Sequence, residues 1–226
     1  MAEEKTYDIG EALIVEGSTE KVFYSEFIEN RALANGVSIA KVADGDGTNY
    51  VATRHDGTSV LVKLNNVGTI TQMTNSAEWF HRSCASRYAD IPWTVFLGYD
   101  TDAYNSNITK FHEGDWARLR NDIEPKAVAI IDLAAKADIE DIMLCNYTGV
   151  LSFLGLPSNT EMPYGRKGKA RMKKLHKMVA LNKPYHEGDK ARPLVRALDM
   201  DEILRTAPIP LGMLEATIVG SSENRM

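Results

Sequence analysis

The segment Ala12-Leu-Ile-Val-Glu-Gly-Ser-Thr-Glu20 decides the fold of this chain. Its apolar run ends at Glu16 and is bounded by Gly17, a pattern that indicates a buried parallel strand. The residues from Ser18 to about Ala34 predict a helix, because aromatic and aliphatic side chains recur four residues apart. The segment therefore predicts a strand that delivers a carboxylate to its tip and then turns into a helix.

Strand and helix patterns alternate along the first 145 residues. Further strands are predicted at 37–42, 60–64, 93–99 and 139–145, and further helices at 75–88, 115–123 and 126–137. Residues 44–57 are rich in turn-forming residues and predict a loop. The alternation predicts an α/β fold, with a mainly parallel sheet flanked by helices over residues 1–150. Residues 151–226 predict a basic segment and a helical C-terminal extension, with one helix at 193–206 and a short closing helix.

The composition is that of an ordinary globular protein. The 226 residues are 44% hydrophobic and 25% charged, with a net charge of −5, which fits one medium domain or a core domain with an extension. This charge gives no global sign of a nucleic-acid partner, although a binding face can lie on an acidic protein. The two cysteines are too few for a disulfide framework or a cysteine-rich zinc site. Without a signal-peptide pattern or an apolar run near the ~18 residues of a membrane span, we expect a soluble cytoplasmic protein.

Acidic residues follow two of the predicted strands. Glu16 ends the first strand, and Asp100 and Asp102 follow the strand at 93–99. Functional groups gather beyond the carboxyl ends of parallel strands, so these carboxylates would converge if the two strands are neighbours. Glu20 lies one turn into the first helix and is placed to face the same point. Such a cluster repels itself, and hard carboxylate oxygens suit a compensating Mg²⁺ or Mn²⁺ ion.

Structural roles for the same residues stay open. An Asp-x-Asp pair is common in turns and helix caps, and Glu20 fits the first turn of a helix that begins after Gly17. The order and spacing of Glu16 and the Asp-x-Asp pair favour the functional interpretation. The segment Asp44-Gly-Asp-Gly47 resembles half of a calcium loop but lacks the later glutamate, so we interpret it as a turn.

The segments LIVEGSTE (13–20) and FLGYDTD (96–102) together resemble the TOPRIM domain of topoisomerases, primases and several nucleases. The form IVEGSTEKVFYSEFIE is most similar to OLD-family nucleases and related small TOPRIM proteins, including RloB-type proteins of bacterial and phage defence loci. The resemblance covers roughly residues 10–150. It implies a TOPRIM-like variant of the Rossmann-like α/β fold.

The resemblance also implies roles for individual residues. Glu16 matches the family's glutamate, a metal ligand or general acid/base. Asp100 and Asp102 match its Asp-x-Asp metal ligands, and Glu20 matches the second glutamate of OLD-type members. We therefore expect Glu16 and Glu20 to act both as metal ligands and as catalytic residues.

One part of the family pattern is missing from the expected place. OLD-type members carry further acids after the last core strand. Here that place reads CNYTGVLSFLG (145–155), which has no acid, whereas Asp138 and Asp141 lie before or within the predicted strand at 139–145. This departure leaves a complete two-metal site in question.

Residues 165–177 form a basic segment in an otherwise acidic chain. Eight of these thirteen residues are basic and none is acidic, a pattern suited to a polyphosphate backbone. From the resemblance, Lys167 or Lys169 is expected to reach a scissile phosphate as a catalytic lysine. A solvated helix face is the alternative. The predicted nucleic-acid-binding residues are Arg166, Lys167, Lys169, Arg171, Lys173, Lys174 and Lys177.

These observations predict a Mg²⁺- or Mn²⁺-dependent nuclease that hydrolyses phosphodiester bonds in DNA or RNA. The resemblance implies a phage-defence or mobile-element setting and a separate ATPase subunit as partner, and a homo-oligomer stays open. No P-loop and no tyrosine in a topoisomerase context is recognised, which disfavours autonomous ATP use and topoisomerase activity. The alternatives are another phosphoryl-transfer reaction, or a non-cleaving TOPRIM subunit that binds nucleic acid or a partner, which the missing acid favours.

Overall fold

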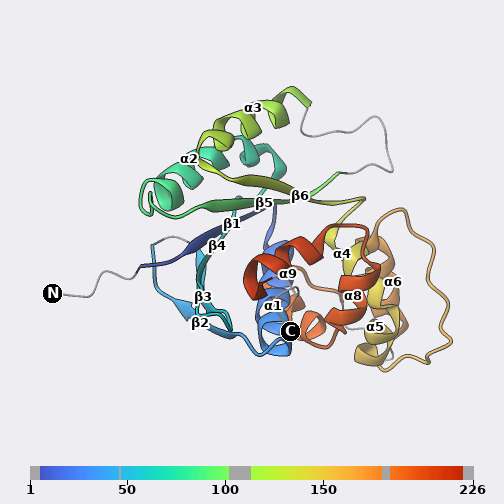
Figure 1. Cartoon of the computed structure of the whole chain (residues 1–226). Helices are drawn as coiled ribbons and strands as arrows, with labels where there is room; N and C mark the ends of the chain where they lie inside the picture. Colours follow the sequence, from blue (N-terminus) through green and yellow to red (C-terminus); the bar gives the residue numbers. More distant parts are fainter. Residues whose placement is uncertain (1–5, 46, 102–112, 180–183, 221–226) are drawn as a thin grey trace.

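The computed structural model describes residues 6–45, 47–101, 113–179 and 184–220. Within them the strands are β1 (Ile9–Val15), β2 (Ser38–Val42), β3 (Thr48–Thr53), β4 (Ser59–Asn66), β5 (Trp93–Asp100) and β6 (Ala129–Ala135). These six described strands form one sheet in the order β2-β3-β4-β1-β5-β6 (Figure 1). β1 pairs in parallel with β4 and β5, and β5 with β6, whereas β3 pairs antiparallel with β2 and β4. The predicted α/β fold is confirmed, and it is Rossmann-like.

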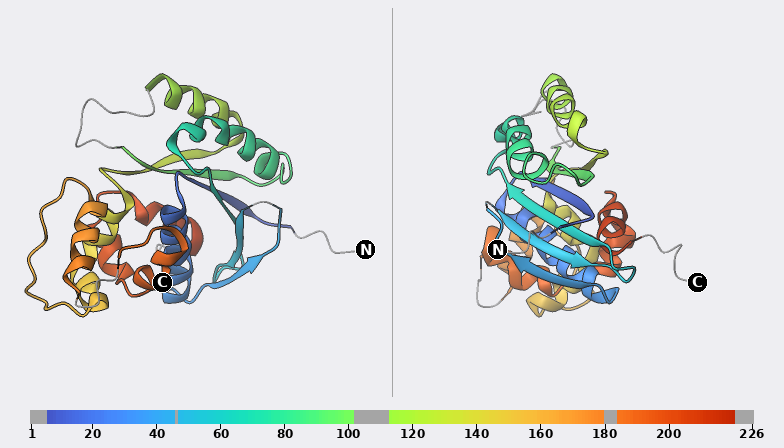
Figure 2. Two further views of the ribbon diagram at one scale, coloured as in Figure 1. Left: turned by 180° about the vertical axis from the view of Figure 1, so that it is seen from behind. Right: turned by 60° about the vertical axis from the view of Figure 1, so that its left-hand side comes forward.

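Helices cover both faces of the sheet. Those of the described residues are α1 (Ser18–Ala34), α2 (Ser76–Phe80), α3 (Glu113–Ile123), α4 (Ile139–Met143), α5 (Tyr147–Leu154), α6 (Gly168–Met178), α7 (Arg192–Arg196), α8 (Met200–Thr206) and α9 (Leu211–Val219). Figure 1 and the view from behind in Figure 2 show α2 and α3 on one face, with α1 and the C-terminal helices on the other. No helix in the described part of the chain is long and apolar enough to cross a membrane.

β1 lies inside the sheet because its side chains are apolar on both faces. Ala12 and Ile14 belong to the core that α2 and α3 complete, whereas Leu13 and Val15 belong to the core shared with α1. A strand buried on both faces reads as a continuous apolar run, which is why this segment could be recognised in the sequence.

The sequence interpretation is wrong for residues 126–145. The predicted helix at 126–137 contains β6, and the predicted strand at 139–145 begins with α4. Alanine and leucine favour helices in isolation, but pairing with β5 overrides that preference. The side chain of Asp138 accepts a hydrogen bond from a backbone amide in the first turn of α4, so a helix cap follows β6.

Two other segments differ from the prediction. The predicted loop at 44–57 contains β3, which pairs with strands on both sides. The predicted helix at 193–206 is divided into α7 and α8, because the Asp199 side chain accepts amide hydrogen bonds from the first turn of α8 and starts a new helix. The helices predicted at 75–88 and 115–123 are present as α2, which a π-helical turn extends, and as α3.

The C-terminal helices are joined to α1 by ion pairs as well as by apolar packing. Arg31 Nη1 lies 2.5 Å from Asp201 Oδ1, and its Nε lies 2.7 Å from Glu215 Oε1, which links α1 to α8 and α9. Glu26 of α1 pairs with Arg192 of α7. One apolar core extends from the sheet through these helices. The division into a core and an extension at residue 150 stays a prediction.

Glu11 is a charged residue in the interior of β1. It is 1% exposed, and neither carboxylate oxygen has a hydrogen-bond partner among the described residues. Burial raises the pKa of this carboxyl well above its ordinary range, and Arg54 opposes the rise. Glu11→Leu is therefore expected to raise the free energy of unfolding at pH 8 by about 2 kcal/mol, because the core no longer encloses an unpaired carboxyl.

The pH dependence of stability tests the same point. Because the folded-state pKa of Glu11 is raised, its contribution to stability is present below the unfolded value of about 4 and is lost as the pH rises toward the folded value. Urea unfolding should therefore show that the free energy of unfolding falls less between pH 5 and pH 8 for Glu11→Leu than for the wild type. Glu78→Leu, at an exposed acid of α2, is the control. A Glu11→Leu protein less stable than the wild type at pH 8 would contradict the prediction.

Candidate active site

A polar cavity of about 270 Å³ lies at the carboxyl ends of β1 and β5. Its walls come from the β1–α1 junction, the end of β5, the start of α4, the start of α6 and the segment before α7. The residues that line it are Glu16, Gly17, Ser18, Thr19, Glu20, Gly68, Asp100, Asp138, Ile139, Glu140, Lys167, Lys169 and Glu187. Because six of them carry carboxylates, we call it the carboxylate cavity.

Glu16 and Asp100 lie at the tips of adjacent parallel strands. β1 and β5 pair in register up to Val15 and Gly98, so the next residues of each strand lie at one edge of the sheet. The Glu16 amide donates to the Gly98 carbonyl over 3.0 Å, and the Asp100 amide donates to Glu16 Oε2 over 3.2 Å. The structure thus brings these two predicted site residues together. The third, Asp102, lies outside the described residues.

Glu20 lies in the first turn of α1, and its carboxylate turns back over Gly17. A Cβ atom at position 17 would lie 2.6 Å from Glu20 Oε2, so a larger residue there would displace the carboxylate. Burial raises the pKa of Glu20 to about 7; its own amide opposes the rise, and Glu16 and Glu140 add to it. Glu20 therefore both starts the helix and faces the cavity.

Asp138 and Glu140 are cavity residues that the sequence interpretation did not assign to the site. They follow β6, which comes last among the described strands, whereas the sequence interpretation looked for acids after Cys145, where α5 begins two residues later. The acids expected after the last core strand are therefore present once that strand is assigned correctly. An aspartate three residues after the run 129–135, with acidic residues two and three positions later, is a helix-start signal that could have located them.

Asp138 connects two helices at the edge of the cavity. Its Oδ1 accepts the Asp141 amide of α4 over 3.2 Å, and its Oδ2 accepts the Lys169 amide of α6 over 3.1 Å. The helices approach so closely that a Cβ atom on Gly168 would lie 2.3 Å from the Asp141 nitrogen. This contact brings the start of α6, with Lys167 and Lys169, to the carboxylates.

Glu140 is held by a buried tyrosine. The Tyr185 hydroxyl donates to Glu140 Oε1 over 2.8 Å, and Tyr185 is 7% exposed. Burial raises the pKa of Glu140 to about 7, and Asp138 adds to the rise, whereas the hydrogen bond from Tyr185 opposes it. Tyr185 therefore fixes the orientation of this carboxylate.

The pKa of Asp100 is raised more than those of Glu20 and Glu140. Burial raises its pKa to about 9, and the neighbouring carboxyls of Glu20, Glu16, Asp138 and Glu140 add to the rise. Its Oδ1 is buried and makes no hydrogen bond within the described part of the chain. The cavity thus has more carboxyl groups than lysines, and the buried carboxyls resist ionisation.

Lys169 is a lysine of the cavity wall that pairs with an acid. Its Nζ lies 2.5 Å from Glu187 Oε2, and Lys173 Nζ lies 3.8 Å from the other oxygen of Glu187. Burial would lower the pKa of Lys169, but Glu187 and the carboxylates of Glu140 and Asp138 raise it overall. The lysine therefore stays charged at neutral pH.

The rest of the basic segment lies along α6 and the residues before it. Arg171 Nη2 pairs with Asp141 Oδ1 over 2.5 Å, and Lys174 Nζ donates to the Tyr164 carbonyl over 2.8 Å. The buried residues of α6 include Met172. The exposed basic residues are Arg166, before the helix, and Lys173, Lys174 and Lys177 within it. The segment thus combines a packed helix with a charged outer face.

The chemistry of these donors fits a hard divalent cation. The carboxylates supply oxygen ligands; burial raises the pKa of Asp100, Glu20 and Glu140, and neighbouring carboxyls add to each rise. No group of three or more His, Cys, Asp or Glu side chains among the described residues is already arranged to hold a metal ion. Metal binding would therefore require some of these carboxylates to reorient.

Comparisons with known proteins give little information about this site. No protein-family model and no curated protein matches the sequence. Among solved structures, a futalosine hydrolase mutant of Helicobacter pylori strain 26695 is 7% identical, with a TM-score of 0.28 over 93% of each chain. A likeness this weak carries no argument about the site, and the TOPRIM resemblance stays a sequence-based prediction.

Proposed function

We propose that this chain is a Mg²⁺- or Mn²⁺-dependent nuclease that hydrolyses phosphodiester bonds in DNA or RNA. The observation that supports this best is the carboxylate cavity, where four buried or half-buried carboxylates meet beside a charged lysine. The four are Glu16, Glu20, Asp100 and Glu140, and the lysine is Lys169. Carboxylates that repel one another gain most from a cation, and carboxylate-bound cations beside a lysine suit phosphoryl chemistry.

Each group has a role that follows from its position. Glu16, Glu20, Asp100 and Glu140 would hold the cation, which supplies positive charge that polarises a phosphate and lowers the pKa of water. Asp138 accepts hydrogen bonds from backbone amides of two helices, so its role is to position the start of α6. Lys169 would neutralise negative charge that develops on the phosphate in the transition state.

The start of α1 supports a phosphate ligand. Ser18 and Thr19 line the cavity with the first turn of a 17-residue helix, whose amino end favours anions. The exposed lysines of α6 add positive charge beyond the cavity. A substrate with several phosphates in a row would use both features.

The resemblance to OLD-family and small TOPRIM proteins supports a phage-defence or mobile-element setting with a separate ATPase subunit. The non-cleaving alternative depended on a missing acid after the last core strand. Asp138 and Glu140 lie after β6, so that argument no longer favours a non-cleaving subunit.

Cleavage assays test the proposal. Plasmid DNA, single-stranded DNA and RNA are incubated with the protein and Mg²⁺, Mn²⁺ or EDTA. We expect metal-dependent cutting that Glu16→Gln lowers at least about 100-fold, because the variant loses a charge at the point where the cation and phosphate would meet. Glu78→Gln, at an exposed acid of α2, is the control and should cut like the wild type. Metal-dependent cutting that survives Glu16→Gln would place the activity elsewhere.

A further inference from the structure

The loop between α5 and α6, residues 155–167, exposes an aromatic ring beside the carboxylate cavity. Tyr164 is 82% exposed, the highest value among the exposed large hydrophobic residues of the described chain. Lys167, three residues later, lines the cavity. Three residues of chain span at most about 10 Å, so the tyrosine lies close to the mouth of the cavity.

This loop is held in place at several points. Lys174 Nζ donates to the Tyr164 carbonyl over 2.8 Å and lies 5.8 Å from the centroid of the Tyr164 ring. On the other side, the Tyr147 hydroxyl of α5 donates to the Thr160 carbonyl over 3.1 Å. An exposed ring on an anchored loop loses little conformational freedom when it binds a partner.

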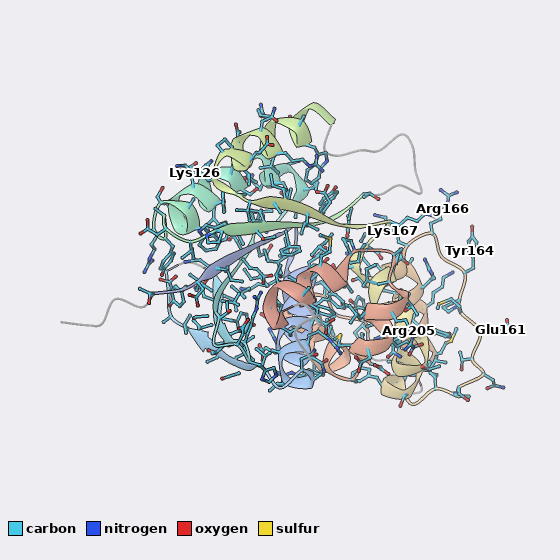
Figure 3. All side chains as sticks on the ribbon, viewed as in Figure 1. Lys126, Glu161, Tyr164, Arg166, Lys167 and Arg205 are labelled. Carbon is cyan, nitrogen blue, oxygen red and sulfur yellow. The ribbon has the colours of Figure 1, made fainter. Side chains whose placement is uncertain are left out.

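Basic side chains lie near the ring. Figure 3 shows Lys167 at the inner end of the loop, and Arg166 and Tyr164 farther out with their side chains directed away from the body of the protein. Lys174 adds a cation beside the ring. The aromatic face and the positive charges therefore form one strip that leads to the carboxylate cavity.

We propose that Tyr164 stacks on an unpaired base of a single-stranded nucleic acid whose backbone follows Arg166 and Lys167 to the carboxylate cavity. The surrounding cations match a polyanion, and an exposed ring between them offers a face to a base. Inside a duplex each base face is covered by its neighbours, so a single strand is the form that presents one. The inference rests on the proposed function, because it takes the cavity as the place that holds a phosphate of the strand.

Binding can be measured without cleavage. Fluorescence anisotropy with Ca²⁺ in place of Mg²⁺, a hard cation that carboxylates also bind, uses labelled single-stranded DNA, single-stranded RNA and a blunt duplex and compares the wild type with Tyr164→Ala and Tyr164→Phe. We expect Tyr164→Ala to weaken single-strand binding by about 10- to 100-fold and to leave duplex binding unchanged, whereas Tyr164→Phe keeps the ring and binds within about twofold of the wild type. Phe153→Ala, at a 40% exposed aromatic residue of α5, is the control and should bind like the wild type.

A strand with one abasic position identifies stacking directly. An abasic position opposite the ring should weaken the wild type as much as Tyr164→Ala does, and the two changes together should weaken binding no further. The inference would be overturned if Tyr164→Ala bound single strands as tightly as the wild type, or if it lost equal affinity for single strand and duplex. A wild type that binds no single strand would also overturn it.

The result is separable from the nuclease proposal. Single-strand binding that depends on Tyr164, in a protein that cuts nothing, would support this inference and count against the proposed activity. A protein that cuts nucleic acid, and whose single-strand binding does not depend on Tyr164, would support the proposed activity and count against this inference.

Discussion

Asp100→Asn is expected to stabilise the metal-free protein while abolishing its response to Mg²⁺. Burial and four neighbouring carboxyls raise the pKa of Asp100 to about 9, so at pH 8 this carboxyl must take up a proton when the chain folds, which lowers the stability of the folded state. The asparagine side chain has nearly the same shape and carries no charge, so the substitution removes the repulsion between carboxylates. It also removes a carboxylate that would bind the metal. At pH 8 we expect a gain of about 2 kcal/mol or more in the free energy of unfolding, which raises Tm by roughly 4–8 °C.

The sign of the pH effect follows from the raised pKa. The contribution of Asp100 to stability is present below the unfolded value of about 4 and is lost as the pH rises toward about 9. The Tm of the metal-free wild type should therefore fall more between pH 5 and pH 8 than the Tm of Asp100→Asn does. Thermal unfolding at these two pH values in EDTA measures the difference.

Titration with Mg²⁺ completes the experiment. Mg²⁺ should raise the Tm of the wild type and of the control Asp122→Asn, at an exposed acid of α3, and leave that of Asp100→Asn nearly unchanged. Cleavage by Asp100→Asn should fall at least about 100-fold. If Asp100→Asn is less stable than the wild type in EDTA, the carboxyl has a structural role, and repulsion between carboxylates does not destabilise the cavity. If Mg²⁺ stabilises the variant as much as the wild type, the cation binds elsewhere.

The first half of the site could be predicted because its signals are local. A buried run that ends at Glu16, followed by a glycine and a helix, fixes a strand tip whatever the rest of the chain does. The apolar run before Asp100 is equally clear. Parallel pairing of the two strands then places both tips at one edge of the sheet.

The second half of the site depends on contacts that no local pattern contains. The run 129–135 reads as a helix from its alanines and becomes a strand through its place beside β5. Because of that single error, the last strand was predicted to end at Cys145. Asp138 and Glu140 were therefore not recognised as the acids that follow it. The pairing of Lys169 with Glu187 and the hydrogen bond from Tyr185 to Glu140 join residues 18 and 45 positions apart, so spacing alone could not reveal them.

The second large effect is expected at the Asp44–Lys63 pair. Lys63 is fully buried in β4, and its Nζ lies 2.6 Å from Asp44 Oδ2, while Arg87 lies 2.5 Å from the other oxygen. Burial would raise the pKa of Asp44, but the hydrogen bonds from Lys63 and Tyr88 hold it below its ordinary value. The turn that the sequence predicted around Asp44 is thus tied to the sheet by a buried charge.

Asp44→Ala should lower the free energy of unfolding by about 3–5 kcal/mol, because it leaves the Lys63 ammonium buried beside an alanine. Lys63→Met should cost less, because methionine fills the same space and Asp44 keeps Arg87 as a partner. In the Lys63→Met background, Asp44→Ala should therefore lose most of its effect, which urea unfolding of the four proteins of this double-mutant cycle measures. If Asp44→Ala costs the same with and without Lys63, the aspartate stabilises the turn itself, and the buried pair contributes little to holding this turn on the sheet.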